Sequence, residues 1–133
     1  FKNKIKIIGI VSTEKDYKLS WLINNLLNLH LKRGNVDIIP SLKDKLIPVF
    51  YFDQDDISYL KYILIKNKYE DVILFPHLKS FDYFLVISGI FDEDYIFSIY
   101  NKLKNLEFII AAYILQKENF KNIKKIVELL NLF

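Results

Sequence analysis

The chain has 133 residues and a mass of 15.9 kDa, the size of one domain, so we expect a single domain over residues 1–133. Hydrophobic residues make up 52% and charged residues 26%, which excludes a disordered chain, because disorder requires low hydrophobicity with high net charge. The absence of cysteine excludes disulfides, thiolate nucleophiles and cysteine-ligated metal sites. The sequence starts at Phe1 and has no methionine, which predicts that residues before Phe1 have been removed.

The net charge is +3, and nearly all of the basic residues are lysines, since Arg33 is the one arginine. Lysine, asparagine and isoleucine are abundant and alanine is rare, a composition typical of an AT-rich genome. Codon bias therefore explains part of the basic charge. The scarcity of arginine also argues against reading of base edges, for which a bidentate guanidinium is the commonest contact. Because apolar runs such as Phe81–Ile90 are too short or broken for a membrane helix, we expect a soluble, cytoplasmic protein with no membrane contact.

The first third of the chain predicts a strand and a long helix. Lys4–Ser12 is rich in β-branched residues and is typical of a buried strand. Thr13, with acidic residues after it, predicts a helix start, and apolar residues recur at helical spacing from Leu19. The last turn is expected to contain His30, Lys32 and Arg33, with Gly34 as the stop.

The middle of the chain predicts four strands separated by short polar turns. They are Val49–Asp53, Tyr59–Lys66, Val72–Phe75 and Phe81–Gly89. The last is almost wholly apolar, which favours a central position in the sheet.

The final third predicts a helix, a strand and a second helix. The first helix opens at Asp92–Asp94 and continues with apolar residues at helical spacing. Phe108–Leu115 follows as a strand, and Asn122–Leu132 is predicted as an amphipathic C-terminal helix. The order favours an α+β fold, a mostly antiparallel sheet with two helices on one face, loosely ferredoxin-like, plus the C-terminal helix. The pattern leaves the strand order open.

Acid–base chemistry has one candidate centre, at His77. This residue follows Pro76 at a strand end and precedes Asp82 and Tyr83, so the three side chains form a hypothetical proton-transfer group. The structural alternative is a turn that Asp82 braces and against which Tyr83 packs, and it is favoured because no nucleophile motif accompanies the group. His30 is predicted to interact with a helix C-terminus.

Metal and cofactor sites are not expected. Asp53, Asp55 and Asp56 alternate as in a calcium loop, but Ser58 and Leu64 occupy the positions where that loop requires glycine and glutamate. A solvated bend is favoured instead. The three glycines are too dispersed for a phosphate-binding loop.

A lysine patch is the basis for a nucleic-acid hypothesis. Its C-terminal members, the candidate phosphate contacts, are Lys117, Lys121, Lys124 and Lys125. If the alternating Lys2, Lys4 and Lys6 lie near them, the group is suited to phosphate contact without sequence readout. The alternative is a solvated surface in a lysine-biased chain.

Binding to another protein or to a second copy is the remaining class. Aromatic residues make up 16% of a short chain, so we expect some tyrosines to stay exposed, and tyrosine is enriched at interfaces. The candidates are Tyr51, Tyr59, Tyr62, Tyr95, Tyr100 and Tyr113. This predicts a homo-oligomer or an adaptor and names no partner.

The segment FPHLKSFDY at residues 75–83 resembles the signature of the IPExxxVDY family, small uncharacterised bacterial proteins of similar length. Pro76, Asp82 and Tyr83 match the motif, whereas Phe75, His77 and Phe81 replace its isoleucine, glutamate and valine. The stretches 16–21 and 117–120 are also similar, so the resemblance covers most of the chain.

The resemblance implies no activity, cofactor or substrate. The retained residues fit a structural corner, in which Pro76 ends one strand and Asp82 binds turn amides before the next. We therefore expect a non-enzymatic adaptor or oligomeric module. The alternatives are an RNA- or ribonucleoprotein-associated protein without sequence specificity, and an enzyme that uses His77 and Asp82.

Overall fold

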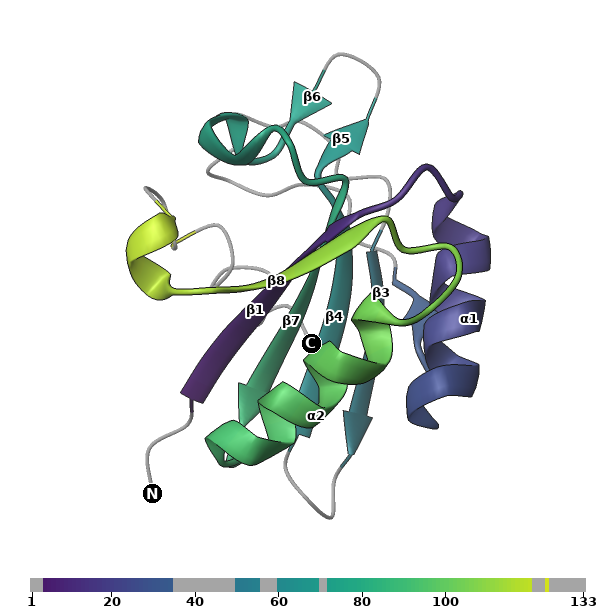
Figure 1. Ribbon diagram of the computed structural model, residues 1–133, viewed down its shortest axis with the longest axis vertical. Coiled ribbons are helices and arrows are strands. Elements are labelled where there is room, and N and C mark those ends of the chain that lie inside the picture. The colour runs from purple at the N-terminus through teal and green to yellow at the C-terminus, as the bar shows by residue number, and fades with distance from the viewer. Residues whose placement is uncertain (1–3, 35–49, 56–59, 70–71, 121–123, 125–133) are drawn as a thin grey trace.

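The computed structural model describes residues 4–34, 50–55, 60–69, 72–120 and 124 (Figure 1). In chain order the elements are β1 (Lys4–Val11), α1 (Asp16–Leu27), β2 (Lys32–Arg33), β3 (Phe50–Asp55), β4 (Leu60–Lys66), β5 (Lys68–Tyr69), β6 (Val72–Ile73), the 3₁₀ helix η2 (Pro76–Leu78), β7 (Tyr83–Gly89), α2 (Glu93–Lys104), β8 (Ala111–Leu115) and the 3₁₀ helix η3 (Lys117–Asn119). Neither α-helix in these ranges is long and apolar enough to cross a membrane.

Among the described residues, six strands form one sheet in the order β2-β3-β4-β7-β1-β8, and every neighbouring pair is antiparallel. The predicted α+β class and antiparallel sheet are confirmed. The central position predicted for the apolar strand is also confirmed, because β7 lies between β4 and β1. β5 and β6 form a separate two-stranded ribbon, which projects with η2 from one end of the sheet (Figure 1).

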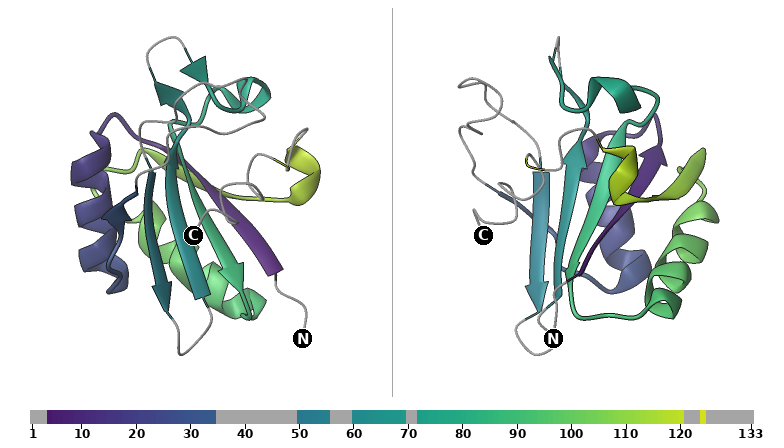
Figure 2. Two further views of the ribbon diagram at one scale, coloured as in Figure 1. Left: turned by 180° about the vertical axis from the view of Figure 1, so that it is seen from behind. Right: turned by 90° about the vertical axis from the view of Figure 1, so that its left-hand side faces the viewer.

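Both α-helices pack on the same face of the sheet, as predicted (Figure 2). Alternate residues of β1 point to opposite faces, so Ile8 and Ile10 enter the core beneath the helices while Ile7 faces the other side. The helix-side core includes Leu19 and Ile23 of α1. A second core on the opposite face contains Ile7, Ile63, Ile65, Leu74, Phe75, Phe81, Phe84, Val86 and Phe120.

The start of α2 agrees with its sequence signal. The Asp92 carboxylate accepts a hydrogen bond from the backbone N–H of Tyr95 (2.8 Å), and Glu93 and Asp94 occupy the first turn. Negative charge there stabilises the positive end of the helix dipole. The Tyr95 and Tyr62 hydroxyls hydrogen-bond to each other, which attaches this end of α2 to β4.

The predicted end of α1 is wrong. The helix stops at Leu27, because Asn28 adopts the left-handed conformation (φ 56°), and its N–H donates to the carbonyl of Asn24. The Asn24 side chain then accepts from Leu31 N–H (2.7 Å) and donates to Leu31 C=O (3.1 Å), which fixes the chain after the helix. His30, Lys32 and Arg33 are therefore not in a helical turn, and the two basic residues form β2. The start also differs, since the helix is preceded by Lys15 with no side-chain cap.

Among the described residues, four predicted strands extend beyond those observed; the first of them, β1, ends at Val11 instead of Ser12. Leu74 and Phe75 do not continue β6, because Asn67 binds the backbone N–H groups of both, through its carbonyl (2.7 Å) and its side chain (2.9 Å). β7 begins at Tyr83 instead of Phe81. β8 begins at Ala111, because residues 106–110 form turns with backbone bonds such as Ile109 N–H to Leu106 C=O. The predicted C-terminal helix lies, apart from Lys124, outside the described residues.

Candidate functional site: a braced corner and two exposed apolar surfaces

The family-like motif forms a corner, which we define as Phe75–Tyr83, and buried Asn67 holds it together. The Asn67 amide donates to the carbonyls of Leu78 (3.1 Å) and Phe81 (2.9 Å), while its oxygen accepts from Phe75 N–H (2.9 Å). Its backbone N–H also donates to the carbonyl of Asp82 (2.9 Å). One side chain therefore satisfies three backbone groups of an irregular segment that has no strand ladder to satisfy them. Sequence reasoning assigned Asn67 only to a turn.

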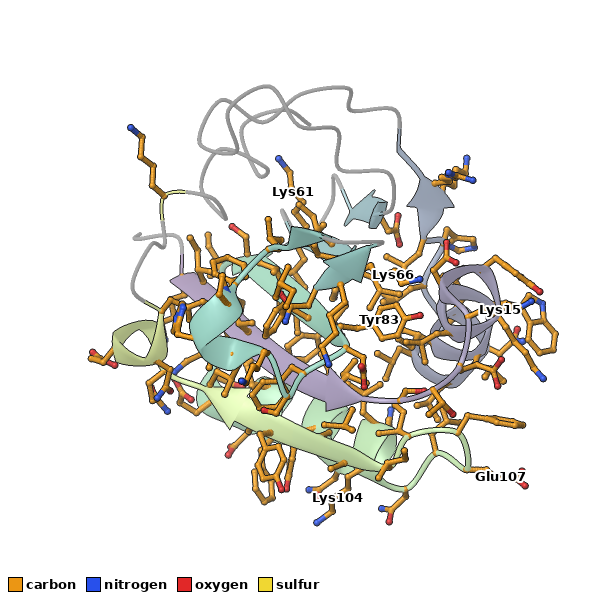
Figure 3. All side chains as sticks on the ribbon, turned by 90° about the horizontal axis from the view of Figure 1, so that it is seen from above. Lys15, Lys61, Lys66, Tyr83, Lys104 and Glu107 are labelled. Carbon is orange, nitrogen blue, oxygen red and sulfur yellow. The ribbon has the colours of Figure 1, made fainter. Side chains whose placement is uncertain are left out.

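Asp82 and Tyr83 attach the corner to the loop between β1 and α1. Asp82 accepts from the backbone N–H of Ser12 (2.9 Å) and lies 3.4 Å from the ammonium of Lys68. The Tyr83 hydroxyl donates to the carbonyl of Glu14 (2.6 Å). Figure 3 shows Tyr83 in the interior, between the strands and the first turn of α1. Asp82 thus binds a backbone amide, although this amide is that of Ser12 in the loop after β1 and does not belong to the turn beside Asp82.

Replacing Tyr83 by phenylalanine is expected to destabilise the fold by about 1–2 kcal/mol, because the carbonyl of Glu14 loses a partly buried hydrogen-bond donor. Denaturant unfolding of both proteins measures the difference. Tyr17→Phe is the matched control, since that ring is exposed and its loss of a hydroxyl should change the free energy of unfolding by less than about 0.5 kcal/mol. Equal effects of the two substitutions would contradict the role given to Tyr83.

Aromatic rings cover the side of the corner that faces the helix-free core. The Phe75 ring is fully buried and meets Phe84 and Phe120 edge to face, at centroid distances of 5.5 and 5.1 Å. His77 is also near this group, 6.1 Å from Phe75 and 6.4 Å from Phe120. Its Nε2 donates to the carbonyl of Asn119 (3.0 Å), which joins η2 to η3. These contacts connect the corner to the segment after β8.

Gly9 of β1 provides the space for Phe81. A Cβ atom at Gly9 would lie 2.6 Å from two carbons of the Phe81 ring and 3.1 Å from a methyl of Leu115. The ring also packs against Phe84 and Tyr113, both at 5.8 Å between centroids. The Phe81 ring therefore seats the corner directly on the backbone of β1.

The three residues of the hypothetical proton-transfer group make different contacts. His77 binds Asn119, Asp82 binds Ser12 and Lys68, and the Tyr83 hydroxyl binds the carbonyl of Glu14. These contacts connect strands, loops and 3₁₀ helices to one another, so they stabilise the corner. Asp82 thus has Lys68 as a charged partner, whereas the contacts described for the His77 ring nitrogen and the Tyr83 hydroxyl are with backbone carbonyls.

The lysines of the predicted patch are only partly described. Lys124 is exposed, whereas the side chains of Lys117, Lys121 and Lys125 lie outside the described residues. At the N-terminus, Lys6 lies 3.6 Å from Glu93 of α2, on the helix-covered face of the sheet. Phe120, by contrast, packs on the opposite face. Elsewhere, burial lowers the pKa of Lys61 on β4, which Figure 3 labels.

The polar candidates near β3 have structural contacts. Asp53 accepts from the backbone N–H of His30 (2.9 Å), which joins β3 to the segment after α1. The side chains of Asp55 and Asp56 lie outside the described residues. Among the side chains that are described, no group of three or more histidine and carboxylate residues is placed to hold a metal ion. An open cleft of about 440 Å³ lies at the end of α1, lined by Asn24, Asn25, Asn28, Leu29, His30, Leu31 and Lys32.

Large apolar side chains are exposed on the outer side of α1. Tyr17 and Trp21 are 60% and 61% exposed, and their four-residue spacing places them on one side of the helix. Lys18 extends from the same helix to lie 4.7 Å above the ring of Phe108, which is itself partly exposed. We call Tyr17, Trp21 and Phe108 the α1 surface.

A second apolar surface lies along the last strand. β8 is at the end of the sheet, and its only ladder among the described residues is with β1. Tyr113 on this strand is 54% exposed, and Ile110 just before it is 69% exposed. We call the outer side of Ala111–Leu115 the β8 edge.

No protein-family model, curated protein or solved structure matches this chain.

Proposed function

We propose that this chain is a protein-binding module, an adaptor or an oligomeric subunit, and not an enzyme. The observation that supports this most is the α1 surface, where an exposed tryptophan and an exposed tyrosine share one side of a helix. Tryptophan and tyrosine dominate the binding energy of protein interfaces. An exposed tryptophan one helical turn from an exposed tyrosine is the pattern of a surface that a partner covers.

The corner supports the same proposal, because the contacts of its polar residues are structural. Asp82 and Tyr83 of the corner, and Asn67 beside it, bind backbone groups, so their described contacts brace the fold. We propose on this basis that the IPExxxVDY-like motif is a structural signature that fixes β1, β7 and η2 together. Apolar replacements at Phe75 and Phe81 then preserve its role, because both side chains are buried in the helix-free core.

We further propose that the sheet is a ferredoxin-like variant. The elements β1, α1, β4, β7, α2 and β8 follow one another as in the split β-α-β-β-α-β motif. Their strands lie in the order β4-β7-β1-β8, with β3 and β2 added beside β4. In such a sheet β8 and the added strands are the two edges.

Native affinity purification of the tagged chain at low and high salt tests the protein-binding proposal. We expect a discrete protein, or a second copy of the chain, that stays bound at high salt, because burial of apolar surface is insensitive to salt screening. RNA released at high salt would instead support phosphate contact by the lysines, since counterion release makes such contacts salt-sensitive. In that case Lys124→Gln, with Lys121→Gln and Lys125→Gln, should weaken RNA binding and flatten its salt dependence.

Replacing Trp21 by alanine is expected to weaken retention of that partner by roughly tenfold or more, because truncation of a central interface tryptophan commonly costs about 2 kcal/mol or more. Phe97→Ala is the matched control, since Phe97 on α2 is 57% exposed and lies outside the α1 surface. Titration of the purified partner against each variant measures the two affinities. The α1 surface would be excluded as the binding site if Trp21→Ala bound as tightly as Phe97→Ala.

A further inference from the structure

The two edge strands of the sheet, β2 and β8, differ in length and in charge. At one end, β2 has two residues, and both of them, Lys32 and Arg33, are charged and exposed. Short, charged edge strands are a common protection against pairing with another chain. At the other end, β8 has five residues, AAYIL, with no charge and no proline. Of the two edges formed by the described strands, β8 is therefore the one suited to the addition of a further strand.

The sequence of β8 is complementary to itself when read in the opposite direction. Tyr113 is the central residue of Ala111–Leu115, with two alanines before it and two branched aliphatic residues after it. An antiparallel pair centred on Tyr113 places Ala111 opposite Leu115 of the other copy, and Ala112 opposite Ile114. Every small residue therefore faces a large one, which is the arrangement that packs closely across a strand pair.

We propose that two copies of this chain associate through the β8 edge, antiparallel and with Tyr113 at the two-fold axis. The proposal deepens the proposed function, because it names a second copy as one partner of a protein-binding module. The two six-stranded sheets then form one continuous sheet, and the outward backbone groups of each β8 hydrogen-bond to its partner. A two-fold axis requires such a self-complementary surface, since each residue meets the same segment of the other copy.

The side chains at this edge explain why a second copy is favoured over an unrelated strand. Tyr113 projects from the helix-free face, where its ring lies 5.8 Å from that of Phe81, and it remains 54% exposed. At the axis the two Tyr113 rings would lie side by side and each would cover the exposed part of the other. Ile110, which immediately precedes the strand, adds an exposed apolar side chain at each end of the pair.

Substitution at Tyr113 tests both the interface and its register. Tyr113→Lys places two ammonium groups opposite each other at the axis, so it is expected to raise the dimer dissociation constant by roughly tenfold or more, and Tyr113→Glu is expected to do the same. A mixture of the two variants pairs lysine with glutamate at the axis and should recover a heterodimer. Phe97→Lys is the control, because it adds the same charge at an equally exposed position on α2.

Sedimentation equilibrium of the full chain over a range of concentrations measures the association, with circular dichroism to verify that each variant is folded. A concentration-dependent dimer that Tyr113→Lys disrupts, that Phe97→Lys preserves and that mixing restores would support the proposal. A wild-type chain that stays monomeric, a dimer unaffected by Tyr113→Lys, or a mixture that stays dissociated would each overturn it. Loss of the dimer leaves partner retention through Trp21 unchanged, so this proposal and the proposed function can fail separately.

Discussion

Replacing Asn67 by alanine is expected to lower the free energy of unfolding by about 3 kcal/mol or more. The side chain is buried, and it is a hydrogen-bond partner of Phe75 N–H, Leu78 C=O and Phe81 C=O. Alanine removes these hydrogen bonds, and a buried backbone group that loses its partner costs about 1–3 kcal/mol, although the Leu78 carbonyl keeps the bond from Phe81 N–H (3.1 Å). For a chain of this length the loss corresponds to a decrease in Tm of roughly 10 °C or more.

Denaturant titration of wild type, Asn67→Ala and Asn24→Ala measures this effect against a matched control. Asn24 also binds the backbone through its side chain, with Leu31 as its partner, but it is only half-buried, and water replaces part of what is lost. We expect Asn24→Ala to cost about 1 kcal/mol. A value for Asn67→Ala that did not exceed this control would mean that Asn67 does not hold the corner.

Replacing Gly9 by alanine is expected to lower the free energy of unfolding by about 2 kcal/mol. This is expected even though alanine loses less conformational entropy than glycine when it enters a strand. The added Cβ would lie 2.6 Å from the Phe81 ring, which is buried and packs against the rings of Phe84 and Tyr113, so the ring must shift against these neighbours. The cost should therefore depend on the ring and not on the backbone of β1.

A double-mutant cycle separates these two causes. In a Phe81→Leu background, we expect Gly9→Ala to cost at least about 1 kcal/mol less than in the wild type, because the smaller side chain leaves room for the methyl group. Thermal or denaturant unfolding of the four proteins measures the coupling. If the cost were the same in both backgrounds, the contact between Gly9 and Phe81 would not be what limits this position.

Regular elements with a strong pattern could be predicted from the sequence. β1, β7 and α2 are marked by β-branched residues, a continuous apolar run and an acidic helix start, and each of these signals acts within a few residues. The end of α1 was predicted too late because Asn28, and not Gly34, takes the left-handed conformation. Glycine is the commoner residue at that position, so Gly34 gave the stronger sequence signal although asparagine also adopts the conformation.

The corner could be predicted only as a turn, because its partners are distant in the sequence. Asp82 and Tyr83 bind Ser12 and Glu14, which are separated from them by 70 and 69 positions, and no local pattern indicates such contacts. Asn67 likewise looks like an ordinary turn residue in the sequence, because no local pattern indicates its bonds to Phe75, Leu78 and Phe81. Trp21, in contrast, was detectable, since it lies on the side of the predicted helix opposite Leu19 and Ile23.

Hydrogen–deuterium exchange tests most directly whether this chain functions through its exposed apolar surfaces. Exchange would be compared between the dilute purified chain, the concentrated chain and the material retained on affinity purification. We expect amides of β8 to exchange more slowly in the concentrated chain, and amides of α1 to exchange more slowly with a retained partner, because covered segments open less often. Identical exchange of both segments in all three samples would contradict the assignment of this chain as a protein-binding module.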